Sequence, residues 1–431
     1  MTKNFILQNA VNAKGISADI VIEAGLIRSS ATPGVQHEIV DCTGLVVLPG
    51  FVDLHTHLRE PGFEQSETVA TGSRSAAAGG FTAIHAMANT FPVADTAGVV
   101  EQVARLGEDA GLVFVQPIGA VTIGLKGEQL AELGAMAQSK AKVRIFSDDG
   151  HCVHDPALMR RALEYVKAFD GVIAQHAQEP RLTVNSQMNE GALSAKLGLA
   201  GWPGVAEEAI IARDLMLTEL TQSRLHVCHV STAGSVELIR QAKLRGVRVS
   251  AEVTPHHLLL TEDLASSYDP IFKVNPPLRK QSDVEALRAG LIDGTIDVVA
   301  TDHAPHPKES KDTDWASAAF GMVGLESAYS ITQLVLIDSG KSNFERLAEV
   351  LSITPAAISG LTKQGTYLQV GEPANLTLVD PEFTFTALAK THSMSENNPY
   401  QGQQFKGAIV HTIYSGEFTY RDKTLIKKET H

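Results

Sequence analysis

The chain has 431 residues, of which 44% are hydrophobic and 20% are charged, a composition typical of a soluble protein with room for a barrel and an accessory domain. Its net charge of -13 argues against nucleic acid or an anionic membrane as the main partner. No apolar run reaches the ~18 residues that span a bilayer, and three widely spaced cysteines exclude a disulfide framework. We therefore expect a cytoplasmic protein.

The two ends of the chain contain short strand-like runs separated by turns. Such runs occupy residues 5–7, 20–23 and 45–48 near the N-terminus, and residues 376–379 and 408–413 near the C-terminus. Neither end is long enough to bury a good core alone. We expect residues 1–48 and 366–431 to pack together as one small β-sandwich domain.

Strands and helices alternate between these ends. Eight candidate strands span residues 46–57, 81–90, 111–120, 142–149, 171–178, 225–232, 248–257 and 297–305. Stretches rich in Ala and Leu between them, such as 67–78, 155–168, 206–220 and 234–244, are typical of helices. The alternation indicates parallel strands, and eight repeats predict an α/β fold, a (β/α)8 TIM barrel over residues 49–365. A doubly wound open sheet is the alternative, but no Gly-x-Gly-x-x-Gly follows the first strand.

Potential metal ligands lie where these strands end. His55 and His57 close the first strand, and residues two apart share a strand face, so both rings can reach one ion. A lone histidine is more often structural. Other strands, however, end in the same way, at Asp148-Asp149, His176, His229 and Asp302. Since barrel chemistry occurs at the C-terminal ends of the strands, the pattern predicts a metal site there.

Four motifs together resemble dihydroorotases of the amidohydrolase superfamily, in the long bacterial class. They occupy residues 55–62, 146–150, 275–279 and 301–306, in the order that the family shows, and the resemblance extends over nearly the whole chain. It implies a zinc-dependent, reversible cyclisation of N-carbamoyl-L-aspartate to (S)-dihydroorotate in pyrimidine biosynthesis. A metal-bound hydroxide and an aspartate general acid/base would carry out the reaction.

The resemblance also implies the metal ligands. His55 and His57 would bind the first Zn²⁺, His176 and His229 the second, and Asp149 would bridge the two. Asp302 would bind the first metal and act as the catalytic acid/base. Spacing alone does not separate Asp149 from its neighbour Asp148, and gap-free matching to the family selects Asp149. One or two zinc ions per subunit are expected, with two favoured.

Substrate contacts follow from the same matching. They are His57, Leu58, Arg59, Asn89, Asn275, His306, Phe320 and Gly321. Arg59 has the forked donor geometry that suits a substrate carboxylate, and two residues beyond His57 it would share that residue's strand face. Asn89 and Asn275 could equally be turn residues. His256 and His257 are candidates for a supporting role, and the polar segment 307–314 is expected to be a solvated loop or a lid.

Two other functions remain open. Related cyclic amidohydrolases, such as allantoinase or dihydropyrimidinase, generally use a carboxylated lysine bridge, but Lys142 lies at the opposite end of the fourth strand, about 20 Å away at ~3.3 Å per residue. An inactive scaffold subunit for aspartate transcarbamoylase should have lost metal ligands, yet all six are present. The resemblance further implies a small-molecule substrate and a homodimer, and leaves open an association with aspartate transcarbamoylase.

Overall fold

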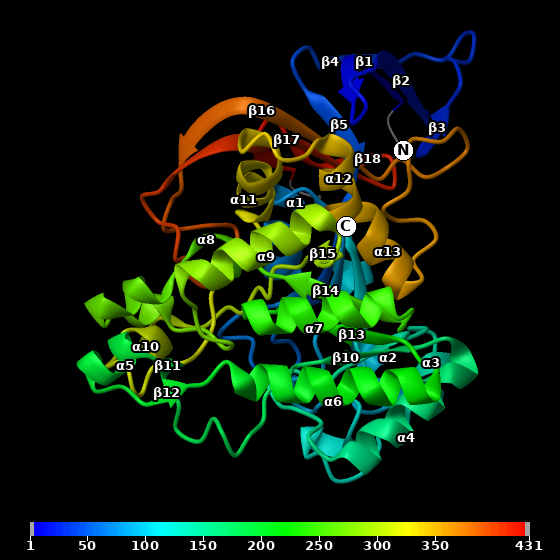
Figure 1. The fold of residues 1–431 in the computed structure, drawn as a ribbon. Helices are drawn as coiled ribbons and strands as arrows, with labels where there is room; N and C mark the ends of the chain where they lie inside the picture. The colour runs from blue at the N-terminus through cyan, green and yellow to red at the C-terminus, as the bar shows by residue number, and fades with distance from the viewer. Residues whose placement is uncertain (1–3, 427–431) are drawn as a thin grey trace.

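The computed structural model describes residues 4–426 (Figure 1). At its centre, eight parallel strands form a closed barrel made of two arcs. One arc pairs β6 (Phe51–Thr56), β7 (Phe81–Ala86) and β8 (Phe114–Pro117). The other pairs β9 (Ile145–Phe146), β10 (Val172–Gln175), β13 (Leu225–Val227), β14 (Val249–Val253) and β15 (Val298–Val299). Parallel bridges between Gly119 and Phe146 and between Thr56 and His303 join the arcs. Each predicted strand contains one of these eight, so the predicted barrel is confirmed.

Helices cover the outside of the barrel. The larger ones are α1 (Val69–Ala78), α2 (Ala97–Ala110), α4 (Pro156–Val166), α6 (Val205–Thr221), α7 (Ala233–Leu244) and α9 (Gln281–Asp293). Shorter ones are α3 (Leu133–Gln138), α5 (Ala192–Leu197), α8 (Pro255–Leu259), α10 (Lys308–Lys311), α11 (Ala328–Gln333), α12 (Phe344–Ala348) and α13 (Thr354–Ser359). Figure 1 shows α4, α6, α7 and α9 side by side on one flank. None of the helices in the described range 4–426 is long and apolar enough to cross a membrane.

Local chemistry explains where the helices begin. The Asp155 side chain accepts a hydrogen bond from the Leu158 backbone N–H, and Pro156 occupies the first turn of α4. Such a cap satisfies a backbone donor that the helix leaves free, and proline has the φ angle that a first turn needs. Thr232 caps α7 in the same way through Ser235. The four predicted helices therefore begin and end within two residues of the observed ones.

The first predicted strand, residues 46–57, is in fact two strands. β5 (Val46–Pro49) pairs with strands of the terminal domain, whereas β6 begins the barrel. Gly50 separates them, and a Cβ atom there would lie 2.2 Å from the Thr82 hydroxyl. Only glycine allows this close approach, and the chain passes from one unit to the other at this point.

Strands from both ends of the chain form one nine-stranded sheet. The N-terminal strands are β1 (Phe5–Asn12), β2 (Ser17–Glu23), β3 (Leu26–Arg28) and β4 (Glu38–Asp41), together with β5. The C-terminal strands are β16 (Leu376–Thr386), β17 (Gln404–Tyr414), β18 (Glu417–Arg421) and β19 (Thr424–Leu425). Antiparallel pairing of β5 with β16 joins the two sets. Phe5 and Ile22 share a buried cluster with Leu376 and Ile413, so the two ends form a common core, as predicted. A two-stranded sheet of β11 (Met188–Asn189) and β12 (Gly201–Trp202) lies apart from both.

Candidate metal centre

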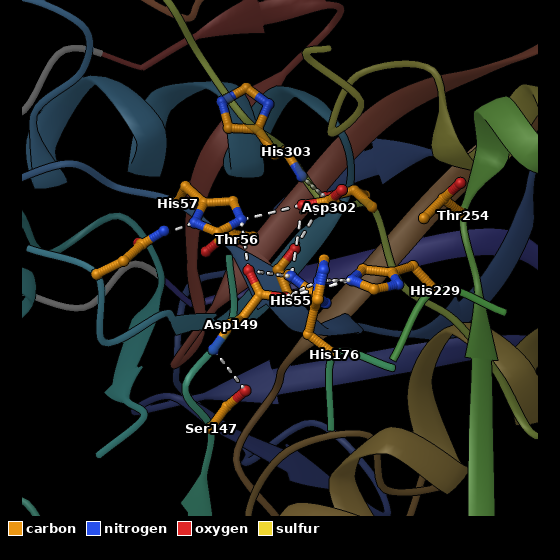
Figure 2. Close-up of polar contacts among 12 residues, drawn as sticks. His55, Thr56, His57, Ser147, Asp149, His176, His229, Thr254, Asp302 and His303 are labelled. Atoms are coloured by element: carbon orange, nitrogen blue, oxygen red, sulfur yellow. Dashed lines mark hydrogen bonds and ion pairs between the residues drawn. The ribbon is translucent and has the colours of Figure 1, made fainter. Parts of the chain in front are cut away.

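Four histidines and two aspartates converge at the C-terminal end of the barrel (Figure 2). His55 lies in β6 and His57 just beyond it, and the other four side chains follow β9, β10, β13 and β15. All six are buried, and they are His55, His57, Asp149, His176, His229 and Asp302. The structure thus brings together the whole predicted ligand set.

Asp149 lies between two pairs of imidazoles. Its Oδ2 is 3.4 Å from His55 Nε2 and 3.3 Å from His57 Nε2. Its Oδ1 is 3.3 Å from His176 Nδ1 and 3.2 Å from His229 Nε2. Each carboxylate oxygen therefore faces one pair, the arrangement that a carboxylate bridge between two cations needs.

Asp302 joins the first of these pairs. Its Oδ1 lies 3.0 Å from His57 Nε2 and 3.4 Å from His55 Nε2. The backbone of Asp302 has a φ of 44° and that of His229 a φ of 30°, in the left-handed region that residues other than glycine rarely adopt. Such backbone strain is concentrated at functional sites, where the surrounding fold enforces it.

Partners on the outer side of three rings orient the opposite nitrogens toward Asp149. The outer nitrogens of three rings lie within hydrogen-bond distance of oxygens: His55 Nδ1 of Glu252 Oε1 at 2.6 Å, His57 Nδ1 of Asn89 Oδ1 at 3.0 Å and His176 Nε2 of Gln178 Oε1 at 2.8 Å. An outer N–H that donates to oxygen leaves a lone pair on the inner nitrogen. His55 Nε2 is buried without a hydrogen-bond partner.

The donor set fits divalent cations. Within the described part of the chain, His55, His57 and Asp149 form one group of possible ligands, and Asp149, His176 and His229 form another. Atoms within each group lie within 4.8 Å of one another. Imidazole and carboxylate donors suit Zn²⁺ and its first-row neighbours.

The two carboxylates remain ionised. Burial raises the pKa of Asp302, but the nearby His55 and His57 rings outweigh this effect and lower the pKa to about 2. Burial likewise opposes ionisation of Asp149, yet His55, His176 and His229 hold its pKa well below the ordinary value. Both groups can therefore serve as anionic ligands or proton acceptors near neutral pH.

Arg59 lies close to the cluster, but its predicted position on the strand face of His57 is wrong. β6 ends at Thr56, and Arg59 has a φ of 64° in the loop beyond it. Its Nε donates to the Pro305 carbonyl at 3.2 Å, and its guanidinium lies 3.4 Å from His306 Nε2. Burial lowers the pKa of Arg59 to about 10, so the side chain stays charged.

His306 connects Arg59 to the next loop. The Nε2–H of His306 donates to the Phe320 carbonyl at 2.7 Å. Burial, with help from Arg59, lowers the pKa of His306 to about 3, so the ring is neutral. Gly321 has a φ of 142°, and a Cβ atom there would lie 2.8 Å from His306 Nε2. Glycine is therefore required at this position.

The remaining predicted contacts differ in how they face the cluster. Asn275 Nδ2 donates to Gln178 Oε1 at 3.2 Å, and its Oδ1 is buried without a partner. The Leu58 side chain is buried in the main hydrophobic core and lies against the Cα of Gly72. The Leu58 side chain therefore does not face the cluster, and its backbone carbonyl accepts from the Glu60 N–H at 2.7 Å.

Glu252 is a site residue that the sequence did not reveal. Its carboxylate contacts His55 Nδ1, lies 2.9 Å from His226 Nε2 and accepts from the His229 backbone N–H at 3.2 Å. Burial raises its pKa, but His55 and His226 hold the group ionised. The sequence feature that could have indicated it is a charged residue inside the apolar run 249–253.

The two histidines that were candidates for a supporting role have different surroundings. His257 contacts Thr254 and the Pro276 carbonyl, whereas both ring nitrogens of His256 are buried without partners.

Comparison with known proteins identifies the family of the chain. A family model described as Dihydro-orotase-like matches residues 44–235. The chain is 61% identical to a dihydroorotase of Leifsonia xyli, covering 99% of this chain and 98% of the relative. It is 57% identical to a dihydroorotase of Streptomyces coelicolor, over 97% of this chain and 99% of the relative.

Solved structures of related enzymes share the fold. An L-hydantoinase (dihydropyrimidinase) from Arthrobacter aurescens superimposes with a TM-score of 0.87 at 26% identity, over 99% of this chain and 98% of that one. A dihydropyrimidinase from Brevibacillus agri gives a TM-score of 0.83 at 23% identity, over 98% and 96% of the two chains.

Proposed function

The chain belongs to the dihydroorotase family, and we propose that it interconverts N-carbamoyl-L-aspartate and (S)-dihydroorotate, a step of pyrimidine biosynthesis, at a centre of two zinc ions. The observation that carries the proposal is the position of Asp149, whose two oxygens face separate pairs of histidines. His55, His57 and Asp302 would hold one ion, and His176 and His229 the other. Divalent ions in such a site lower the pKa of bound water and polarise the amide carbonyl.

Asp302 is the proton carrier in this proposal. During ring opening, its carboxylate accepts a proton from the attacking water and delivers it to the ring nitrogen as the C–N bond breaks. During ring closure, it takes a proton from the carbamoyl nitrogen as the C–N bond forms, and returns the proton to the carboxylate oxygen that leaves as water. Its lowered pKa keeps it in the basic form, and its contact with His57 fixes one carboxylate oxygen beside the other candidate ligands.

Arg59 gives the site its preference for an acidic ring. Its partly buried guanidinium, with Asn89, Asn275 and His306, would bind the substrate carboxylate, and the backbone around Leu58 and Phe320-Gly321 would bind the ring. A charge-assisted, bidentate arginine–carboxylate pair is among the stronger polar contacts in proteins. Hydantoin and dihydrouracil lack this carboxylate, so their rings would leave the charge of Arg59 without an anionic partner.

The experiment that tests the function is a substrate panel with the purified, zinc-loaded protein. Dihydroorotate should be hydrolysed. Hydantoin, dihydrouracil and allantoin should be turned over at least about 100-fold less efficiently, which is the loss expected when one charge-assisted contact is missing. Turnover of only the uncharged rings would reassign the chain to the hydantoinase type.

The assembly of the enzyme is also a proposal. By resemblance to the family we infer a cytoplasmic homodimer, and the same resemblance leaves an association with aspartate transcarbamoylase open. Light scattering of the purified protein, alone and mixed with aspartate transcarbamoylase of the same organism, measures both associations. A monomeric mass for the protein alone would contradict the homodimer. A mixture in which the two proteins keep their separate masses would exclude the association.

A further inference from the structure

Two lysines near the site are buried without acidic partners. Lys273 is 1% exposed and Lys311 is 9% exposed. Buried ammonium groups are normally paired with carboxylates, because removing the charge from water is costly. Within residues 4–426, however, neither ammonium takes part in an ion pair of 4.0 Å or less. Burial lowers the pKa of Lys273 to about 8 and that of Lys311 to about 7.

Each ammonium instead donates to three backbone carbonyls. Lys273 Nζ lies 2.7 Å from Trp315 O, 3.2 Å from Ala316 O and 2.8 Å from Ala318 O. It also lies 4.3 Å from the centre of the Phe320 ring. An ammonium has three N–H donors, so the donor capacity of Lys273 is filled by one loop.

Lys311 connects this loop to a second segment. Its Nζ lies 2.9 Å from Pro270 O, 2.9 Å from Lys273 O and 2.8 Å from Ala319 O. The Gly321 backbone N–H donates to Lys273 O at 3.0 Å. The two lysines thus join residues 270–273 to residues 315–321 through their ammonium groups.

Both joined segments lead directly to proposed substrate contacts. Asn275 follows the first segment by two residues, and Phe320-Gly321 ends the second. The Phe320 carbonyl accepts from His306, which lies against Arg59. A shift of the 315–321 loop would therefore displace His306 and the backbone around Gly321 together, while the metal ligands lie on other elements.

We propose that Lys273 and Lys311 are positioning residues that lock the 315–321 loop against residues 270–273 and so set the affinity for the substrate. This inference rests on the proposed function. The segment 307–314, expected from sequence to be a solvated loop or a lid, contains α10, and Lys311 of that helix anchors the loop. Six backbone carbonyls share two ammonium groups, and the hydrogen bonds to Trp315, Ala318 and Lys273 are buried, so an apolar side chain could not replace these donors.

The test compares Lys273→Met and Lys311→Met with Lys308→Met, an exposed lysine of the same helix. Zinc content, kcat and KM for dihydroorotate are measured together with amide hydrogen exchange of residues 315–321. The expected result is a KM raised at least about tenfold, a kcat within threefold of the parent and unchanged zinc, with faster exchange in the loop. Lys308→Met should match the parent. Lys311→Gln, which keeps two N–H donors, should give an intermediate KM. It replaces Lys311→Met in the test if the methionine variant does not fold.

An unchanged KM in the Lys273 and Lys311 variants would overturn the inference, as would unchanged exchange of the loop. A loss of zinc, or a fall in kcat at constant KM, would show a general structural role instead and would overturn it as well. The exchange measurement does not depend on turnover. If the parent enzyme does not hydrolyse dihydroorotate, the proposed function fails, and the exchange data still decide whether the lysines hold the loop.

Discussion

The carboxylates of Asp148 and Asp149 are adjacent in the chain but have separate partners. Asp149 lies among four imidazoles, whereas Asp148 Oδ1 accepts from the backbone N–H groups of Val121 and Thr122 at 2.8 and 2.9 Å. Its Oδ2 accepts from the Thr122 hydroxyl. One side chain therefore faces the candidate metal site, and the other anchors the loop that follows β8.

Replacing these two aspartates should separate metal binding from stability. Asp149→Ala should bind less zinc and lose at least about 10³-fold in kcat, because an electrostatic group at the reacting atoms is removed. Asp148→Ala should keep its zinc and lose about 1–3 kcal/mol of unfolding free energy, because buried donors lose their acceptor. Metal analysis and urea unfolding check both variants. Zinc loss in Asp148→Ala with full zinc in Asp149→Ala would refute the assignment.

Glu252 should control how tightly the first metal binds. Glu252→Gln removes the negative charge behind His55 while keeping the side-chain shape. Outer partners of this kind typically change metal affinity 10–100-fold, so we expect a zinc dissociation constant about 10–100-fold higher. Competition with a chelator measures it. Glu237→Gln, a change at an exposed glutamate on α7, is the control, and equal affinities in the two variants would exclude the role.

Arg59 should act on substrate binding and not on metal binding. Arg59→Met should raise KM for dihydroorotate about 100-fold, the equivalent of about 2.7 kcal/mol for a lost charge-assisted contact, with zinc content unchanged. The KM of Arg59→Lys should lie between those of the parent and Arg59→Met, since lysine keeps the positive charge but not the bidentate donor geometry of the guanidinium. Arg181→Met is the control, because the Arg181 side chain is 91% exposed. A normal KM in Arg59→Met would remove the guanidinium from the binding site.

The sequence predicted the barrel and the convergence of the six ligands because both depend on local patterns. Apolar runs mark strands, and polar residues at the ends of parallel strands meet at one end of a barrel. The position of Arg59 depended instead on where β6 ends, which pairing in three dimensions decides. Glu252 could not be assigned, because its contact with His55 joins β14 to β6. The sequence alone does not show that side chains of these two distant strands meet. The anchoring by Lys273 and Lys311 likewise depends on main-chain carbonyls distant in sequence.

The measurement that tests the central claim most directly is the hydrolysis of dihydroorotate by the zinc-quantified protein and its Asp302→Asn variant. We predict turnover by the parent with zinc bound, and a variant that retains zinc but loses about 10²–10⁴-fold in kcat, the usual contribution of a positioned acid/base. A variant as active as the parent would contradict the assignment of Asp302 as the acid/base. A zinc-loaded parent without turnover would contradict the proposed function.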